Sequence, residues 1–203
     1  MLPPPGPDVV VFDTETTGCT GWDRVVSLGA VRLDGDTLEP VATLHLVFDP
    51  GRRCHPGAAR VHGLSDSYLR RQPRFEDHAG EVARFFGATE GGPAATGCAH
   101  NLAFDRRMLG AEFDRLGLPR PWGAEACTLR AWRAARPGAR AGLDAASAAL
   151  GLAREGALHG ALEDALLAAQ ILRALARGLP PARGVRAHGF SNARRATGEA
   201  LAA

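Results

Sequence analysis

Residues 9–18, VVVFDTETTG, join a strongly apolar segment to a pair of acids. The three valines and Phe12 predict a buried β-strand. Side chains two positions apart on a strand point to the same face, so Asp13 and Glu15 should lie side by side. Adjacent carboxylates repel each other, and the pKa of each rises unless a cation neutralises the pair. Arg24 is the nearest basic candidate for that role; the simplest alternative is a turn with two solvated acids.

The segments that follow predict an α/β fold with a mixed sheet. Two further apolar segments, residues 24–33 and 41–48, predict strands that short turns connect into an antiparallel meander. The rest of the chain has helical periodicity interrupted by short strands, and Ser65 is a plausible helix N-cap. The predicted helices cover residues 64–73, 75–87, 102–117, the later part of 125–136, 142–151 and 159–178, and strands cover 94–100 and the beginning of 125–136. Such an order of elements is typical of a mixed sheet flanked by helices.

Length and composition indicate one globular domain. The chain has 203 residues, of which 45% are hydrophobic and 23% are charged, as is ordinary for soluble proteins. We expect the domain to span residues 1–178, followed by a basic, mobile tail at 179–203 with little apolar periodicity. No apolar run approaches the roughly 18 residues that span a membrane. The N-terminus has no signal-peptide pattern, so a cytoplasmic protein without a membrane partner is expected.

Two features of the composition exclude classes of chemistry. All 24 residues counted as Lys or Arg are arginines, so a P-loop, which needs its lysine, and a Schiff-base lysine are both excluded. The cysteines form no C-x-x-C pair, which makes a zinc site or a disulfide framework unexpected and predicts free thiols. The net charge of +2 neither implies nor excludes a nucleic-acid partner.

Further acids and one histidine occur at the edges of apolar segments. Asp105 lies about one turn into a predicted helix, for which Asn101 is a natural N-cap. Asp164 lies in the longest predicted helix, and His159 precedes it by five residues. Each has an ordinary structural explanation when taken alone, such as an acid favoured by the helix dipole, a solvated helix face or a histidine with local partners.

Taken together, the four acids and the histidine predict a catalytic metal site. Asp13, Glu15, Asp105 and Asp164 are well suited to converge at one end of the sheet. Hard oxygen ligands select Mg²⁺ or Mn²⁺ over zinc. Two such ions would clamp the attacking and leaving oxygens of a displacement at phosphorus, with water as the nucleophile. His159 has a side chain whose pKa suits it to take the proton of that water.

The motifs FDTETTG, HNLAFDRRML and HGALEDA, in this order and spacing, resemble the three exonuclease motifs of the DEDDh family. The resemblance extends over residues 9–178 and is strongest to the proofreading epsilon subunit of bacterial DNA polymerase III and its free-standing relatives. It implies a ribonuclease-H-like fold, two divalent ions, and 3′→5′ removal of nucleoside monophosphates from a nucleic acid with a free 3′ end. By position, Asp13, Glu15, Asp105 and Asp164 resemble the metal-binding acids, and His159 resembles the general base.

The resemblance also suggests contacts to the terminal nucleotide. Thr14, Thr16, His62 and Asn101 resemble residues near that nucleotide, with capping or local turn roles as the equal alternative. The tail at 179–203 contains no convincing clamp-binding or polymerase-binding segment, which bears on a replicative role more than on the chemistry. Arginines that could contact phosphates, or simply form a solvated surface, are Arg70, Arg71, Arg74, Arg106 and Arg107.

Three functional hypotheses follow. The first is a metal-dependent 3′→5′ exonuclease that acts on DNA in proofreading or repair, with a polymerase as its candidate partner. The second is an RNA 3′→5′ exonuclease for tail trimming or recycling of oligoribonucleotides, which would share the same motifs. The third, from a different class, is a non-catalytic polymerase accessory module, and the intact set of acids and histidine argues against it.

Overall fold

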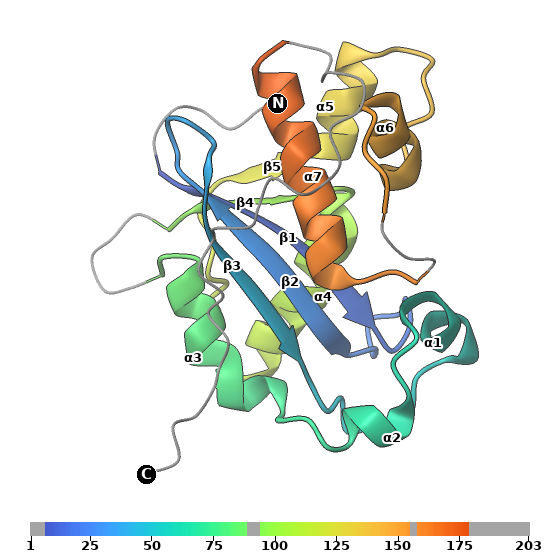
Figure 1. Ribbon diagram of the computed structural model, residues 1–203. Coiled ribbons are helices and arrows are strands. Elements are labelled where there is room, and N and C mark those ends of the chain that lie inside the picture. The colour runs from blue at the N-terminus through green and yellow to red at the C-terminus, as the bar shows by residue number, and fades with distance from the viewer. Residues whose placement is uncertain (1–6, 89–93, 155–157, 179–203) are drawn as a thin grey trace.

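The computed structural model describes residues 7–88, 94–154 and 158–178, and the predicted tail at 179–203 lies outside these residues. The sheet has five strands in the order β3-β2-β1-β4-β5 (Figure 1). The first three strands form the predicted antiparallel meander, and the last two run parallel to β1. The strands are β1 (Val9–Thr16), β2 (Val25–Leu33), β3 (Pro40–Val47), β4 (Thr96–Ala99) and β5 (Glu125–Cys127). The predicted mixed sheet is therefore confirmed.

Helices cover both faces of this sheet, which explains why β1 is apolar on both sides. Two short helices follow the meander, α3 and α4 pack on one face, and α7 crosses the other face beside α5 and α6 (Figure 1). The helices are α1 (Pro56–His62), α2 (Asp66–Leu69), α3 (Phe75–Phe85), α4 (Leu102–Arg115), α5 (Thr128–Ala135), α6 (Leu143–Ala149) and α7 (Ala161–Ala176).

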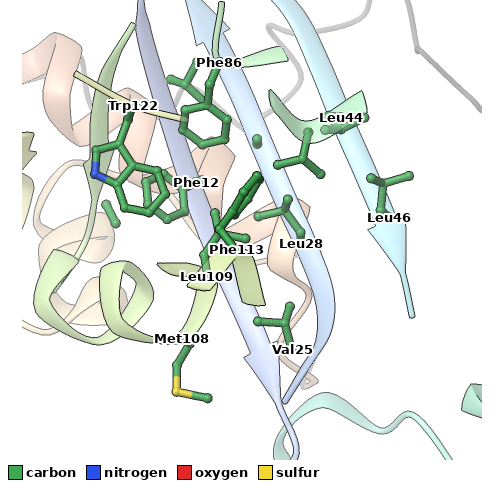
Figure 2. Packing of buried hydrophobic residues seen from close by; sticks show 14 of the residues in the cluster. Phe12, Val25, Leu28, Leu44, Leu46, Phe86, Met108, Leu109, Phe113 and Trp122 are labelled. Carbon is green, nitrogen blue, oxygen red and sulfur yellow. The ribbon is translucent and has the colours of Figure 1, made fainter. Parts of the chain in front are cut away.

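The alternation of side chains along β1 divides the core into two layers. Val10 and Phe12 belong to the layer under α3 and α4, where the Phe12 ring lies 5.4 Å from that of Phe86 and 5.6 Å from that of Trp122 (Figure 2). Val9 and Val11 belong to the layer under α7. Burial of each such side chain contributes about 1.5–3 kcal/mol, so β1 is held firmly from both sides.

The first turn of α7 approaches β2 closely at Gly29. A Cβ atom added to Gly29 would overlap the backbone of Ala161 and Leu162. Only glycine allows this approach, because it has no side chain to keep the two backbones apart. The contact sets the height of α7 above the sheet and hence the position of the acids on its first turn.

Several predictions about individual elements can be checked in the structure. Ser65 caps α2 as predicted, accepting a hydrogen bond from the backbone N–H of Tyr68 at 3.2 Å. Helix α7 begins at Ala161 rather than at residue 159, so His159 lies in the preceding loop. Helix α1 was not predicted; its first turn is capped by the side chain of His55. None of the helices in the described part of the chain could span a membrane.

The predicted N-cap position of Asn101 is confirmed, whereas the candidate role of Arg24 as a counter-ion of the β1 acids is not. Asn101 occupies the N-cap position of α4, but it has a left-handed backbone (φ 75°) and its side chain makes no capping hydrogen bond. Arg24 does not neutralise the acids of β1; it pairs at 2.9 Å with the buried carboxylate of Glu112 on α4. The acids at the end of β1 therefore need another source of positive charge.

Candidate active site

Asp13 and Glu15 lie at the carboxyl end of β1, on the sheet face that α7 covers. They continue the row of Val9 and Val11, which pack against α7, because alternate strand residues share a face. Burial and the nearby charges of Asp105 and Glu15 raise the pKa of Asp13 well above its usual range. Burial also raises the pKa of Glu15 to about 7. The predicted pair is thus a concentration of carboxylates that favours a bound cation.

Asp105 comes to this pair from the opposite side of the sheet, on the first turn of α4. Both the backbone N–H and the hydroxyl of Thr14 donate to its Oδ1, at 2.9 Å and 2.8 Å. Burial raises the pKa of Asp105 to about 7, although the hydrogen bonds from Thr14 act in the opposite direction. Thr14 therefore tethers the third acid to the strand that carries the first two.

Asp164 and His159 come from α7 and the loop before it. The Nδ1 of His159 lies 3.3 Å from Oδ2 of Asp164, and the His159 backbone N–H donates to the carbonyl of Val61 at 3.0 Å. Burial, together with the nearby Arg154, lowers the pKa of His159. The backbone of His159 is thus tied to α1 and its ring faces Asp164 on α7. The lowered pKa favours the neutral imidazole.

The donor atoms of this cluster are close enough to share a cation. Glu15, His159 and Asp164 each offer one ligand atom, and these atoms lie within 4.8 Å of one another. The neighbouring Asp13 and Asp105 add only oxygen donors. A set dominated by carboxylate oxygens fits a hard divalent ion such as Mg²⁺ or Mn²⁺.

A cavity of about 710 Å³ opens beside these groups. Asp13, Asp164 and His159 line one part of it, and Arg133 and Arg140 line another. The acidic part matches a metal site, whereas the arginines place positive charge where a phosphate backbone would be attracted. The cavity therefore combines carboxylates suited to a cation with arginines suited to an anion.

Arg154, like Arg133 and Arg140, is a residue of this cavity that the sequence did not single out. Its guanidinium forms an ion pair with Asp164 and a second one, at 2.8 Å, with Asp144 on α6. It stands in the loop before His159, and nothing in its sequence context distinguishes it from the other arginines. Arg24 was the nearest candidate for a neutralising positive charge, but that charge comes from Arg154, which lowers the pKa values of Asp13 and Glu15 against the effect of burial.

The four residues predicted near the terminal nucleotide have different surroundings. Thr14 binds Asp105, and Asn101 is exposed and lines the cavity. The Thr16 hydroxyl donates to the carbonyl of Gly18 at 2.6 Å, and Nδ1 of His62 accepts from the backbone N–H two residues later at 3.0 Å. Thr14, Thr16 and His62 thus have local structural roles, and a contact of any of the four with substrate stays a prediction.

The arginines proposed for phosphate contacts are also partly engaged within the protein. Arg106 pairs with Glu125 at 3.1 Å. Arg107 donates to the carbonyl of Cys19 at 3.0 Å, and its guanidinium lies 5.6 Å from the centre of the Phe104 ring. Arg70, Arg71 and Arg74 are exposed. A role of these five arginines in binding phosphates stays a prediction.

Comparison with known proteins identifies the class to which this fold and site belong. Residues 10–172 match the family model described as RNase_T, Exonuclease, and the chain therefore belongs to this exonuclease family. The family is divalent-metal dependent, in agreement with the acidic cluster at the end of β1.

Individual relatives agree with the epsilon-like resemblance. The chain is 30% identical over 152 residues to the DNA polymerase III subunit epsilon of Pasteurella multocida (strain Pm70), a match that covers 70% of this chain and 57% of the relative. The chain thus matches little more than half the length of that subunit. The predicted likeness to epsilon subunits is confirmed.

Solved structures support the fold. Exonuclease X, in a complex with 5′-overhanging duplex DNA, has a TM-score of 0.65 and 24% identity, covering 84% of this chain and 92% of that one. A 3′-exonuclease that recognises the histone mRNA stem-loop has a TM-score of 0.68 and 17% identity, covering 86% of this chain and 65% of that one. The predicted ribonuclease-H-like exonuclease fold is confirmed by these neighbours.

Proposed function

We propose that this chain is a metal-dependent 3′→5′ exonuclease that hydrolyses the terminal phosphodiester of DNA and releases nucleoside monophosphates. The observation that carries the proposal is the convergence of Asp13, Glu15, Asp105, Asp164 and His159 from three parts of the chain at the carboxyl end of β1. A purely structural role for this cluster would destabilise the folded protein, because burying several like charges together costs free energy unless a cation is bound.

Asp13, Glu15, Asp105 and Asp164 would hold two divalent ions, Mg²⁺ or Mn²⁺. Bound there, the ions would supply a polarised phosphate and a water molecule of lowered pKa. Thr14 keeps Asp105 turned toward the strand, and Gly29 lets α7 bring Asp164 down to the sheet. The protein thus contributes a prearranged set of oxygens, whose mutual repulsion the ions relieve.

His159 would act as the general base. Its Nδ1 faces Asp164, so Nε2 is the nitrogen left to accept the proton of the attacking water. The lowered pKa keeps the imidazole neutral near pH 7, as a base must be before it accepts a proton. The new P–O bond would form to the water oxygen, and the bond from phosphorus to the 3′-oxygen of the preceding nucleotide would break. That oxygen would take up a proton from solvent and become the new 3′-hydroxyl, and the proton accepted by His159 would be released to solvent.

DNA is the proposed substrate, since the family relative is named as a subunit of a DNA polymerase. The test is digestion of a 5′-labelled single-stranded DNA by the purified chain with Mg²⁺, Mn²⁺ or EDTA. The expected result is a ladder of products shortened from the 3′ end in either metal and none in EDTA. Absence of products with both metals, on DNA and RNA alike, would contradict the proposal and favour a non-catalytic accessory module.

An RNA exonuclease is the second candidate, because a structural neighbour is described as a 3′-exonuclease acting at a histone mRNA stem-loop. Proteins distinguish RNA from DNA largely by contacts to the 2′-hydroxyl. A DNA oligomer and an RNA oligomer of the same sequence, digested side by side, separate the two candidates by their kcat/KM. Faster digestion of RNA would assign the chain to RNA.

Proofreading would further require a polymerase partner, and a cytoplasmic location follows from that role. A mismatched 3′ end should then be removed faster than a paired end, because it frays more easily. Co-purification of the chain with a replicative polymerase would support the partnership. Equal rates on matched and mismatched ends would favour a repair or recycling role instead.

A further inference from the structure

Both oxygens of Asp164 are occupied by side chains of the protein itself. Oδ1 is paired with the guanidinium of Arg154, and Oδ2 faces Nδ1 of His159 at 3.3 Å. The side chains of Arg154 and Asp164 are only 10% and 5% exposed, so water screens this ion pair weakly. An ion that binds to Asp164 through Oδ1 must therefore take this oxygen from Arg154.

Arg154 is set apart from the other arginines of the cavity by this contact. Arg133 and Arg140 line the same cavity, but among the described residues no arginine other than Arg154 forms an ion pair with any of the four acids. Asp144 provides a second anchor for the same guanidinium, and its own side chain is 72% exposed. The guanidinium is thus shared between one buried carboxylate inside the site and one exposed carboxylate at its edge.

We propose that Arg154 is a resident counter-ion of Asp164 that competes with the divalent ions and raises the metal concentration at which the site fills. When an ion binds, the guanidinium gives up Asp164 and keeps its ion pair with Asp144. Without an ion, Arg154 relieves part of the repulsion among the acids, which stabilises the folded site. This inference rests on the proposed function, because it assumes that Asp164 is a metal ligand.

Direct titration of Mn²⁺ into the metal-free, full-length protein tests the competition without a nuclease assay. Arg154→Met retains an unbranched aliphatic stem and removes the charged guanidinium. In this variant Mn²⁺ should bind roughly tenfold more tightly, which is the scale of a lost charge-assisted hydrogen bond. Arg133→Met is the matched control, because it removes the same charge from the same cavity without breaking an ion pair to the acids. Its affinity should change much less, by about threefold at most.

Thermal unfolding gives a second measurement that does not depend on activity. In EDTA, Arg154→Met should unfold at a lower temperature than the wild type, because Asp164 loses its counter-ion. Saturating Mn²⁺ should remove most of this difference, since the ion then supplies the charge. If Arg154→Met does not fold, Arg154→Lys is used in its place. A lysine has no planar guanidinium with which to bridge the carboxylates of Asp144 and Asp164, so its Mn²⁺ affinity should still rise above that of the wild type, but by a smaller factor than in Arg154→Met.

The outcomes separate the two proposals. Unchanged or weaker Mn²⁺ binding in the Arg154 variant, with binding retained in the wild type, overturns the counter-ion role and leaves the nuclease proposal standing. An equal gain in Mn²⁺ affinity in Arg154→Met and Arg133→Met also overturns the counter-ion role, because the gain would then come from removing any positive charge from the cavity. Failure of both proteins to bind Mn²⁺ overturns the metal site itself, and the counter-ion role with it.

Discussion

Thr14 on β1 and Asp105 on α4 are joined by two hydrogen bonds to one oxygen: the backbone N–H and the hydroxyl of Thr14 both donate to Oδ1 of Asp105, at 2.9 Å and 2.8 Å. The two residues are separated by 91 positions in the chain. The bonds join the end of β1 to the first turn of α4. The position of Asp105, one proposed metal ligand, therefore depends on Thr14, the residue between two others.

Replacement of Thr14 by valine should weaken this connection without changing the shape of the side chain. The hydroxyl bond is lost and the backbone bond remains, so we expect a loss of about 1 kcal/mol in the free energy of unfolding. The pKa of Asp105 should rise, because the Thr14 bonds hold it down. Urea denaturation and NMR titration of the Asp105 carboxyl measure the two effects.

Thr16→Val is the control for Thr14→Val, since it removes a hydroxyl two positions further along the same strand. Its hydroxyl donates to the Gly18 carbonyl and does not contact Asp105. An equal change in the pKa of Asp105 in both variants would show that the Thr14 hydroxyl has no special role.

Replacement of Gly29 by alanine should displace the first turn of α7. The added methyl group would overlap the backbone of Ala161 and Leu162, and overpacking of this kind costs about 1–3 kcal/mol or more. Because Asp164 lies on that turn, Mn²⁺ affinity measured by calorimetry should fall together with stability. Gly21→Ala is the control, because a Cβ at Gly21 meets nothing within 4 Å. If Gly29→Ala has the stability and metal affinity of the wild type, the close packing of α7 on β2 is contradicted.

Replacement of Asp13 by asparagine should abolish activity yet stabilise the metal-free protein. Nuclease activity should fall by about 10³-fold or more if Asp13 holds an ion. In EDTA, however, the variant should unfold at a higher temperature, by about 2–4 °C for each kcal/mol gained. The reason is that burial and the neighbouring Asp105 and Glu15 disfavour the ionised form of Asp13 and raise its pKa.

Substitution of Asp36, an exposed turn residue, is the control for Asp13→Asn. Asp36→Asn removes the same charge far from the cluster and should leave both activity and unfolding temperature close to those of the wild type. Retained activity in Asp13→Asn would remove Asp13 from the set of metal ligands, and a lower unfolding temperature in EDTA would contradict the repulsion argument.

Asp23 should make the loop after β1 sensitive to acid. Burial raises its pKa, but hydrogen bonds from the Thr17 hydroxyl and from the N–H and hydroxyl of Thr20, together with Arg52, outweigh this and lower it below the ordinary 3.8. A carboxyl whose folded-state pKa is lowered contributes stability above its unfolded pKa and loses it as the pH falls through the folded one. Asp23→Asn should therefore reduce stability at pH 7, on the order of 1 kcal/mol.

The pH dependence of this loss distinguishes Asp23 from a merely polar loop residue. The difference in unfolding free energy between the wild type and Asp23→Asn should be constant from neutral pH down to about 5 and should shrink below 4. Urea denaturation at several pH values measures it. A difference that stays the same down to the lowest accessible pH would contradict the lowered pKa.

The sequence by itself predicted the order of the strands and of every helix except α1, and it singled out the four acids and the histidine as a candidate site. Both signals lie in short stretches of the sequence. Apolar periodicity indicates which face of an element is buried, and a carboxylate at the end of a buried strand stands out because it departs from that apolar pattern. The run from Val9 to Phe12 followed by Asp13 and Glu15 contains both signals. Order and spacing of three such motifs then indicated an exonuclease family before any contact was known.

Only the tertiary structure decided which residues neutralise and hold those acids. Arg24 is near Glu15 in sequence, yet it pairs with Glu112, whereas Arg154, 141 positions after Asp13, pairs with Asp164. Thr14 was expected beside a nucleotide or in a turn, and it holds Asp105. Charge pairing is determined by distance in space, and that distance depends on how α4 and α7 pack on opposite faces of the sheet. A side chain's partner across such a fold leaves no periodic or local signal in the sequence.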